Sequence, residues 1–133
     1  MINRLTDTLD FQTQALTLRA ERQRLIASNI ANADTPGYAA REINFGDAMR
    51  EATSGSSLPP LAVTHARHQA LPGSSGMVAQ VGYEVATQPS LDGNSVDMDR
   101  ERSKFTDNAI RYESTLRFIN SHVKTMLSAI QGQ

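Results

Sequence analysis

The stretch SNIANADTPGY, residues 28–38, ends a helical pattern with two asparagines and a Pro-Gly pair. Asn29 and Asn32 share one face of the helix while it lasts. Asparagine tolerates the left-handed conformation that closes helices, and its amide can bond nearby backbone groups. Pro36 disfavours the helical conformation of the residue before it. Pro36-Gly37 suits the two central positions of a type II turn, where glycine accepts positive φ. The sequence therefore predicts that the helix stops before Pro36 and that a tight turn follows.

Composition and charge exclude several classes of function. The chain has 133 residues, which suffices for one ordinary domain. Its 13 Lys and Arg residues nearly balance 14 Asp and Glu residues, so no footprint for nucleic acid is indicated. Without cysteine, disulfides, thiolate metal sites and a cysteine nucleophile are excluded together. No apolar run could span a bilayer, and the N-terminal segment does not resemble a secretory signal peptide.

The N-terminal helix, expected over residues 3–31, is apolar on two nearly opposite faces. Leu16 and Leu18, one from each face, point about 200° apart at 3.6 residues per turn. A helix that is apolar on several sides is normally buried among neighbours. We expect the first face to pack within the chain and the second to be left for other subunits. The first face consists of Ile2, Leu5, Leu9, Leu16, Ile26 and Ile30, and the second of Phe11, Ala15, Leu18 and Leu25.

A second long helix is expected over residues 98–130, with Asp97 as its N-cap and Gly132 after its end. Its apolar residues alternate in steps of four and three, a heptad pattern that favours coiled-coil packing. We expect this heptad face to pack on the N-terminal helix and Tyr112 to lie in the core. The heptad face consists of Met98, Phe105, Ala109, Tyr112, Leu116, Ile119, Val123, Met126 and Ile130, interrupted by Arg102.

The middle of the chain, residues 38–96, is rich in turn and loop signals. Residues 45–52 fit one short amphipathic helix, and residues 38–44 and 77–87 fit strands, the latter broken at Gly82. Asp92-Gly93 marks a turn. The predicted fold is therefore mainly α: two long terminal helices form an antiparallel coiled-coil core around a small irregular middle. The predicted segments are 1–37, 38–96 and 97–133.

The whole string around the turn is more specific than its parts. It resembles the signature (A/S)-N-x-A-N-x-x-T-P-G-Y of the axial family of bacterial flagellar rod and hook proteins. Residues 18–45 and 88–113 extend the likeness to a subunit of the proximal rod. The helix after Asp97 lacks the Arg-Ala-Tyr-Glu-Ala-Asn run of many other members, and Ala39 stands where lysine is common. The matching residues are Ser28, Asn29, Ala31, Asn32, Thr35, Pro36, Gly37 and Tyr38.

The resemblance implies a structural subunit of the proximal rod of the flagellar basal body. It implies that both terminal helices line the inner wall of a tubular helical assembly. The implied partners are copies of the chain, other rod subunits, the rod adaptor subunit, the inner-membrane ring protein and the flagellar type III export apparatus. The implied location is the periplasmic rod, reached without a cleaved signal peptide. No enzymatic activity, cofactor, nucleic acid or small-molecule substrate is implied.

Two other classes of function compete with this interpretation. A free-standing coiled-coil adaptor or export chaperone would use the same heptads as a small soluble oligomer. A metal-dependent enzyme could start from His65 and His68, but spacing places no third ligand beside them. The acidic residues around Asp92 fail the pattern of a calcium loop. The arginines at positions 19, 22 and 24 either form a solvated helix face or meet an acidic partner, anionic lipid included.

Overall fold

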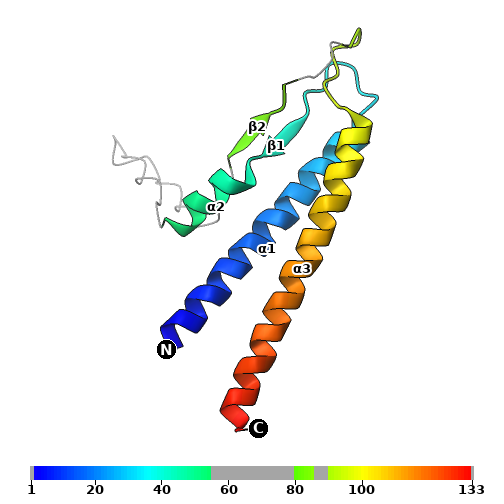
Figure 1. Cartoon of the computed structure of the whole chain (residues 1–133). Coiled ribbons are helices and arrows are strands. Elements are labelled where there is room, and N and C mark those ends of the chain that lie inside the picture. Colours follow the sequence, from blue (N-terminus) through cyan, green and yellow to red (C-terminus); the bar gives the residue numbers. More distant parts are fainter. Residues whose placement is uncertain (1, 55–79, 86–89, 133) are drawn as a thin grey trace, which may run out of the picture.

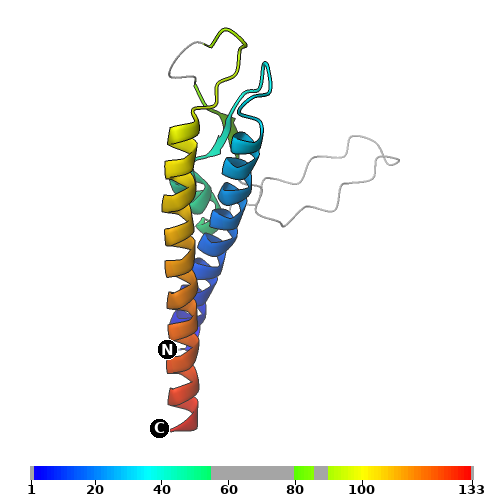
Figure 2. The ribbon, with the colours of Figure 1, turned by 90° about the vertical axis from the view of Figure 1, so that its right-hand side faces the viewer.

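Two long antiparallel helices dominate the chain (Figure 1). The computed structural model describes residues 2–54, 80–85 and 90–132, with side chains from Thr6 onward. Helix α1 spans Ile2–Ala31 and helix α3 spans Met98–Gln131. They run side by side in opposite directions, so both chain ends lie at the same end of the molecule (Figures 1 and 2). The predicted mainly α class with a small middle segment is confirmed.

The ends of helix α3 form as the sequence predicts. The Asp97 carboxylate accepts hydrogen bonds from the N–H groups of Asp99 and Arg100, which have no partner inside the helix. Gly132 lies at φ 71° and donates its N–H to the Ser128 carbonyl. Within the described residues, no helix is long and apolar enough to cross a membrane.

The middle segment supplies a small two-stranded sheet and a short helix beside α1. Strand β1 (Arg41–Ile43) pairs antiparallel with β2 (Val81–Tyr83), and Glu42 lies opposite Gly82. The predicted break at Gly82 is therefore wrong, because this glycine is paired in the sheet. Helix α2 (Phe45–Thr53) matches the predicted short helix and begins at an Asn44 cap. His65, His68 and residues 77–79 and 86–87 of the predicted second strand lie outside the described residues.

The hydrophobic core lies between α1 and the middle segment. Ile43 of β1 and Met49 of α2 pack against the second face of α1, with Phe45 partly buried beside them. That face was expected to be left exposed for contacts with other subunits. The expectation is wrong for three of its residues. The chain covers them itself, because α2 presents its own apolar side to them. They are Ala15, Leu18 and Leu25.

Helix α3 meets α1 through polar side chains rather than through its heptad face. Glu101 and Asn108 are 2% and 1% exposed, and Asn108 Nδ2 donates to the Arg19 carbonyl (2.9 Å) and to Gln23 Oε1 (2.6 Å). Of the heptad face, Met98, Ile119 and Met126 are partly buried, but the expectation that this face packs on α1 within the chain is wrong for five large residues. They stay 36% to 81% exposed: Phe105, Tyr112, Leu116, Val123 and Ile130. The described chain thus buries one apolar face of α1 and leaves an apolar face of α3 open.

Candidate functional site

The Asn29 side chain connects α1, β1 and α3 at the end of the molecule opposite the chain ends, which we call the tip (Figure 1). Its amide nitrogen donates to the Arg41 carbonyl (2.8 Å) and to Glu101 Oε2 (2.9 Å). Its amide oxygen accepts from the Arg41 N–H (3.0 Å) and the Tyr38 hydroxyl (3.3 Å). The side chain is 1% exposed, and these bonds use its full capacity of two donors and two acceptor sites. Asn29 therefore pairs with the backbone of β1 as a neighbouring strand would.

The two asparagines act through their amide groups and not through the left-handed conformation. Among the described residues, only glycines have positive φ, so neither asparagine closes the helix in the left-handed conformation. Asn32 Nδ2 donates back to the Ser28 carbonyl (2.9 Å), and Asn32 Oδ1 accepts from the Thr35 hydroxyl (3.2 Å). Asn32 thus satisfies its own helix end, whereas Asn29 connects separate elements.

The Thr-Pro-Gly-Tyr turn has the predicted form. The Tyr38 N–H donates to the Thr35 carbonyl (3.2 Å), and Gly37 at the third position has φ 72°. Both features belong to a type II turn. Only glycine takes such a φ without strain, which explains the Pro36-Gly37 pair.

The loop that precedes α3 forms hydrogen bonds to this turn and to the residues before it. Asn94 Nδ2 lies 2.9, 2.8 and 2.9 Å from the carbonyl oxygens of Asn32, Ala33 and Thr35, which follow the end of α1. The Gly37 N–H donates to the Asp92 carbonyl (2.8 Å). In the sequence, Asp92 and Asn94 fit a turn and part of a calcium-loop pattern that fails, so the role of Asn94 at this turn is not predicted. No local signal reveals it, because its partners lie about 60 residues away.

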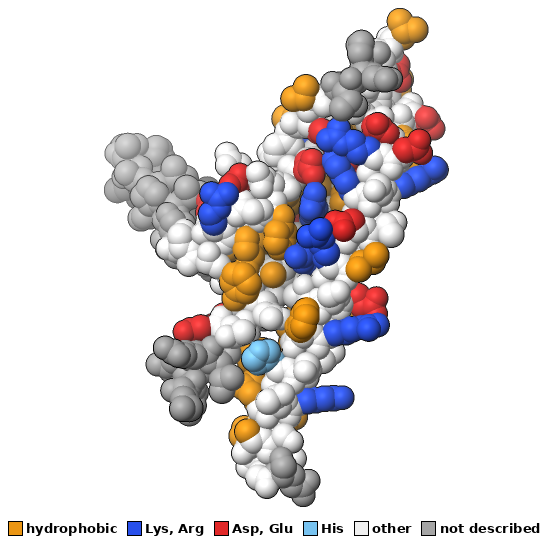
Figure 3. All heavy atoms as spheres, viewed as in Figure 1, with side chains coloured by type: hydrophobic (Ala, Val, Ile, Leu, Met, Phe, Trp, Pro, Cys, Tyr) orange, Lys and Arg blue, Asp and Glu red, His pale blue; other side chains and the backbone are white. Residues whose placement is uncertain are grey.

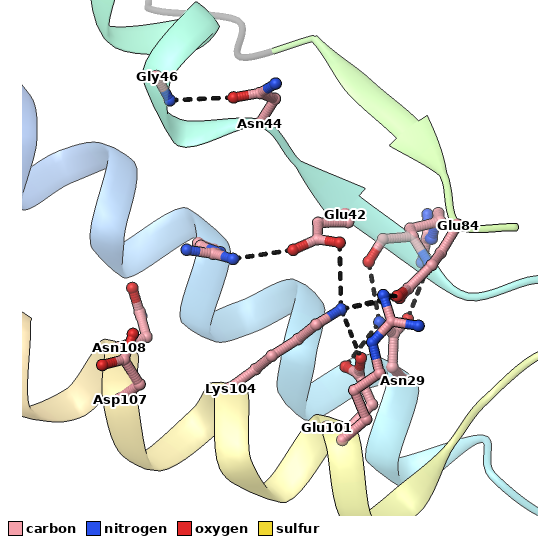
Figure 4. Close-up of polar contacts among 12 residues, drawn as sticks. Asn29, Glu42, Asn44, Gly46, Glu84, Glu101, Lys104, Asp107 and Asn108 are labelled. Carbon is pink, nitrogen blue, oxygen red and sulfur yellow. Dashed lines mark hydrogen bonds and ion pairs between the residues drawn. The ribbon is translucent and has the colours of Figure 1, made fainter. Parts of the chain in front are cut away.

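A network of charges joins the sheet to α3 (Figure 4). Lys104 Nζ lies 2.9 Å from both Glu84 carboxylate oxygens, 3.1 Å from Glu42 Oε2 and 3.2 Å from Glu101 Oε1. Arg22 pairs with Glu42 (2.8 Å), and Arg100 pairs with Glu84. Three carboxylates therefore face three cations across α1, α3 and the strand pair.

The network shifts two pKa values. Burial lowers the pKa of Lys104, but its bonds to Glu84 and Glu42 outweigh this and hold the pKa above its usual value. Burial raises the pKa of Glu42, but the bonds from Arg22 and Lys104 outweigh this and hold that pKa below its usual range. Each group is therefore kept charged by its partners. The network fixes how the strand pair sits on the helices.

The predicted packing residues fall into three groups. Leu18, Leu25 and Ile26 are buried within the chain, and Leu9, Leu16, Ile30, Ile119 and Met126 are partly buried. Phe11 and the exposed heptad residues of α3 stay open, and the side chain of Leu5 lies outside the described ones. Within the described residues, no group of three or more His, Cys, Asp or Glu could hold a metal ion.

The fold and its site define an elongated helical protein with a locked tip and an open apolar face, which is the class of a structural subunit. A family model described as flagella basal body rod protein matches residues 9–38, which include the Asn-Asn turn. The rod protein FlgB of Salmonella typhimurium is 45% identical over 99% of both chains, and that of Escherichia coli is 43% identical over 99%. The FlgB of Proteus mirabilis is 44% identical over 98%.

The chain therefore belongs to the FlgB family of flagellar basal body rod proteins. This confirms the family resemblance noted in the sequence, with a structural role in the flagellar rod and a link to motility. The family implies a place in the basal body and assembly with other rod components.

Proposed function

We propose that the chain is a structural subunit of the proximal rod, which joins the inner-membrane ring to the distal rod and hook. One observation carries the proposal: the apolar heptad face of α3 that the described chain leaves open. Contiguous exposed apolar surface marks interaction sites. The members of this face are Phe105, Tyr112, Leu116, Val123 and Ile130, each at least 36% exposed.

The finer partners follow from the same proposal. The open face of α3 would meet copies of the chain and other rod subunits in heterologous contacts, which build helical assemblies when they do not close. The rod adaptor subunit and the inner-membrane ring protein would flank the segment in the periplasm, after export through the type III apparatus without a cleaved signal peptide. The proposal needs no catalytic step, cofactor, nucleic acid or small-molecule substrate.

The predicted segments keep their roles in this proposal. Segment 1–37 would supply a wall helix and the locked tip, and segment 97–133 would supply the outward packing face. Segment 38–96 would fix the angle between the two terminal helices through its strand pair and α2. The motif residues from Asn29 to Tyr38 would fix the direction in which the chain leaves the wall helix.

The test is a charge placed on the open face. Leu116→Asp should keep the helical content of the purified chain, because Leu116 is 39% exposed there. It should block incorporation into the rod, where an unpaired charge would be buried. Ser114→Asp is the matched control, because Ser114 is exposed and points about 200° away on the same helix. The measurement is the amount of each variant in isolated basal bodies of cells that lack the normal chain.

Equal incorporation of both variants would contradict the role of the open face. Electron cryotomography of cells without the chain tests the wider proposal. Membrane rings with no rod support a proximal structural subunit. A complete rod and hook would sink the proposal and leave the soluble adaptor as the better interpretation.

A further inference from the structure

Arg19 is a half-buried cation that the described chain leaves without a counter-charge. Its guanidinium carbon lies 4.3 Å from the centre of the Phe45 ring, and its Nε has no hydrogen-bond partner. No carboxylate among the described side chains is within ion-pair distance of it. Burial lowers the pKa of Arg19, and the nearby charges of Arg111 and Arg22 lower it further, against a smaller opposing effect of Asp107. The chain thus disfavours the charge that Arg19 carries.

The neighbouring cations do have partners. Arg22 pairs with Glu42 at 2.8 Å, and Arg111 pairs with Asp107 at 2.9 Å. Basic side chains gather beside a hydrophobic area in the middle of the view in Figure 3. A buried cation without an ion pair is costly, so this surface is completed best by a carboxylate from outside the chain.

Asn108 adds a second unfilled position next to Arg19. Its Nδ2 donates to the Arg19 carbonyl, yet its Oδ1 is buried and has no partner among the described residues. The side chain is 1% exposed. This buried atom is closed to an outside partner, so the accessible part of the site is the Arg19 guanidinium beside the Phe45 ring, which fits a partner face with a carboxylate and an aromatic side chain.

The other end of α1 carries such a face. Asp7 and Asp10 are exposed, and neither carboxylate has a partner among the described side chains. Phe11 is 51% exposed. Positions 7, 10 and 11 lie on one side of a helix. This acidic-aromatic face, Asp7, Asp10 and Phe11, cannot reach Arg19 of its own chain, because nine residues separate Asp10 from Arg19 by about 13 Å along the same helix.

We propose that the Arg19 site of one copy receives the acidic-aromatic face of a second copy. The inference rests on the proposed rod function and names one contact within it. The carboxylate of Asp10 neutralises Arg19, with Asp7 beside it on the same face, and Phe11 packs beside Phe45. Two different patches of the same chain meet, so the contact is heterologous and can repeat from copy to copy.

The absence of cysteine makes a direct test possible. Asp10→Cys and Arg19→Cys are placed in one chain, which replaces the normal chain in cells, and isolated basal bodies are treated with a short bis-maleimide reagent. We expect a cross-linked species of twice the 14.5 kDa chain mass, and higher multiples. The matched control pairs Asp10→Cys with Arg24→Cys. Arg24 is exposed, pairs with Glu21 and lies about 140° around the helix from Arg19, so this pair should give no such species.

The outcomes separate this inference from the proposed function. Basal bodies that contain the double variant but yield no doubled species would overturn the contact and leave the rod role standing. A cross-link to a different protein would also overturn it, because the partner would not be a second copy. Basal bodies that lack the unsubstituted chain itself would overturn the rod role and this inference together.

Charge reversal tests the pairing itself. Arg19→Glu and Asp10→Arg should each abolish swimming, and the combination in one chain should restore it. Arg19→Gln serves as the folding control: its helicity should equal or exceed that of the normal chain, because it removes a buried charge. Loss of swimming in the combined variant, with normal helicity, would refute the pairing.

Discussion

Substituting Asn29 tests whether one buried amide holds the tip together. Asn29→Ala removes the bonds to the Arg41 N–H and carbonyl, to Glu101 and to Tyr38. Two backbone groups of β1 then lose their partner, at about 1 kcal/mol each, and a hydrogen bond to a charged carboxylate is worth about 1.5–3 kcal/mol. We therefore expect the free energy of unfolding to fall by about 3.5–5 kcal/mol.

The assay is urea unfolding followed by circular dichroism, with hydrogen exchange at the Arg41 amide as a local reporter. A loss of this size should lower the melting temperature by roughly 10 °C for a chain of this length. Exchange at Arg41 should accelerate, because its N–H donates to Asn29 Oδ1 at 3.0 Å.

Asn32→Ala is the matched control for this prediction. Asn32 is the same residue type one turn away, but its side chain bonds only within its own helix end. The free energy of unfolding should fall by less than about 1 kcal/mol in Asn32→Ala, because its partners are only partly buried or exposed and water can replace the lost bonds. Equal losses for the two variants would refute the assignment of Asn29 as the connecting residue.

Three further changes have defined outcomes. Gly37→Val should lower the free energy of unfolding by about 1–2 kcal/mol, because φ 72° strains any residue with a Cβ; calorimetry measures it, and an unchanged melting temperature would rule out that strain. Asn94→Ala should cost about 1–2 kcal/mol and speed exchange of the Gly37 amide, because its hydrogen bonds to the turn after α1 are lost. In the folded chain, the pKa of Glu42 lies below its ordinary value of 4.5. Between these two pH values the unfolded chain therefore binds more protons than the folded chain. The stabilisation from Glu42 is therefore present above pH 4.5 and is lost as the pH falls through the folded value. Urea titrations from pH 7 to 3 should show this loss, and it should shrink in Glu42→Gln.

The sequence by itself determined the three helices and their ends. Asp97 and Gly132 bound helix α3 as local capping chemistry requires, and Pro36-Gly37 set the type II turn. These features depend on neighbours within a few residues, so a sequence pattern can reveal them. The motif of residues 28–38 was also sufficient to identify the family.

Only the tertiary structure decided which faces meet. Periodicity locates an apolar face but does not say what covers it, and here α2 and β1 cover Leu18 and Leu25 while the heptad face of α3 stays open. Gly82 illustrates the same limit, because a strand partner compensates its weak propensity.

The contacts that lock the tip depend on residues far apart in the chain. Asn29 reaches Glu101 across 72 residues, and Asn94 reaches the Asn32 carbonyl across 62. Lys104 is surrounded by three carboxylates only after α3 and the strand pair have docked. No local pattern encodes such meetings, since a hydrogen bond depends on the final positions of both partners. The sequence thus supplied the parts of the tip, and folding alone brought them within bonding distance.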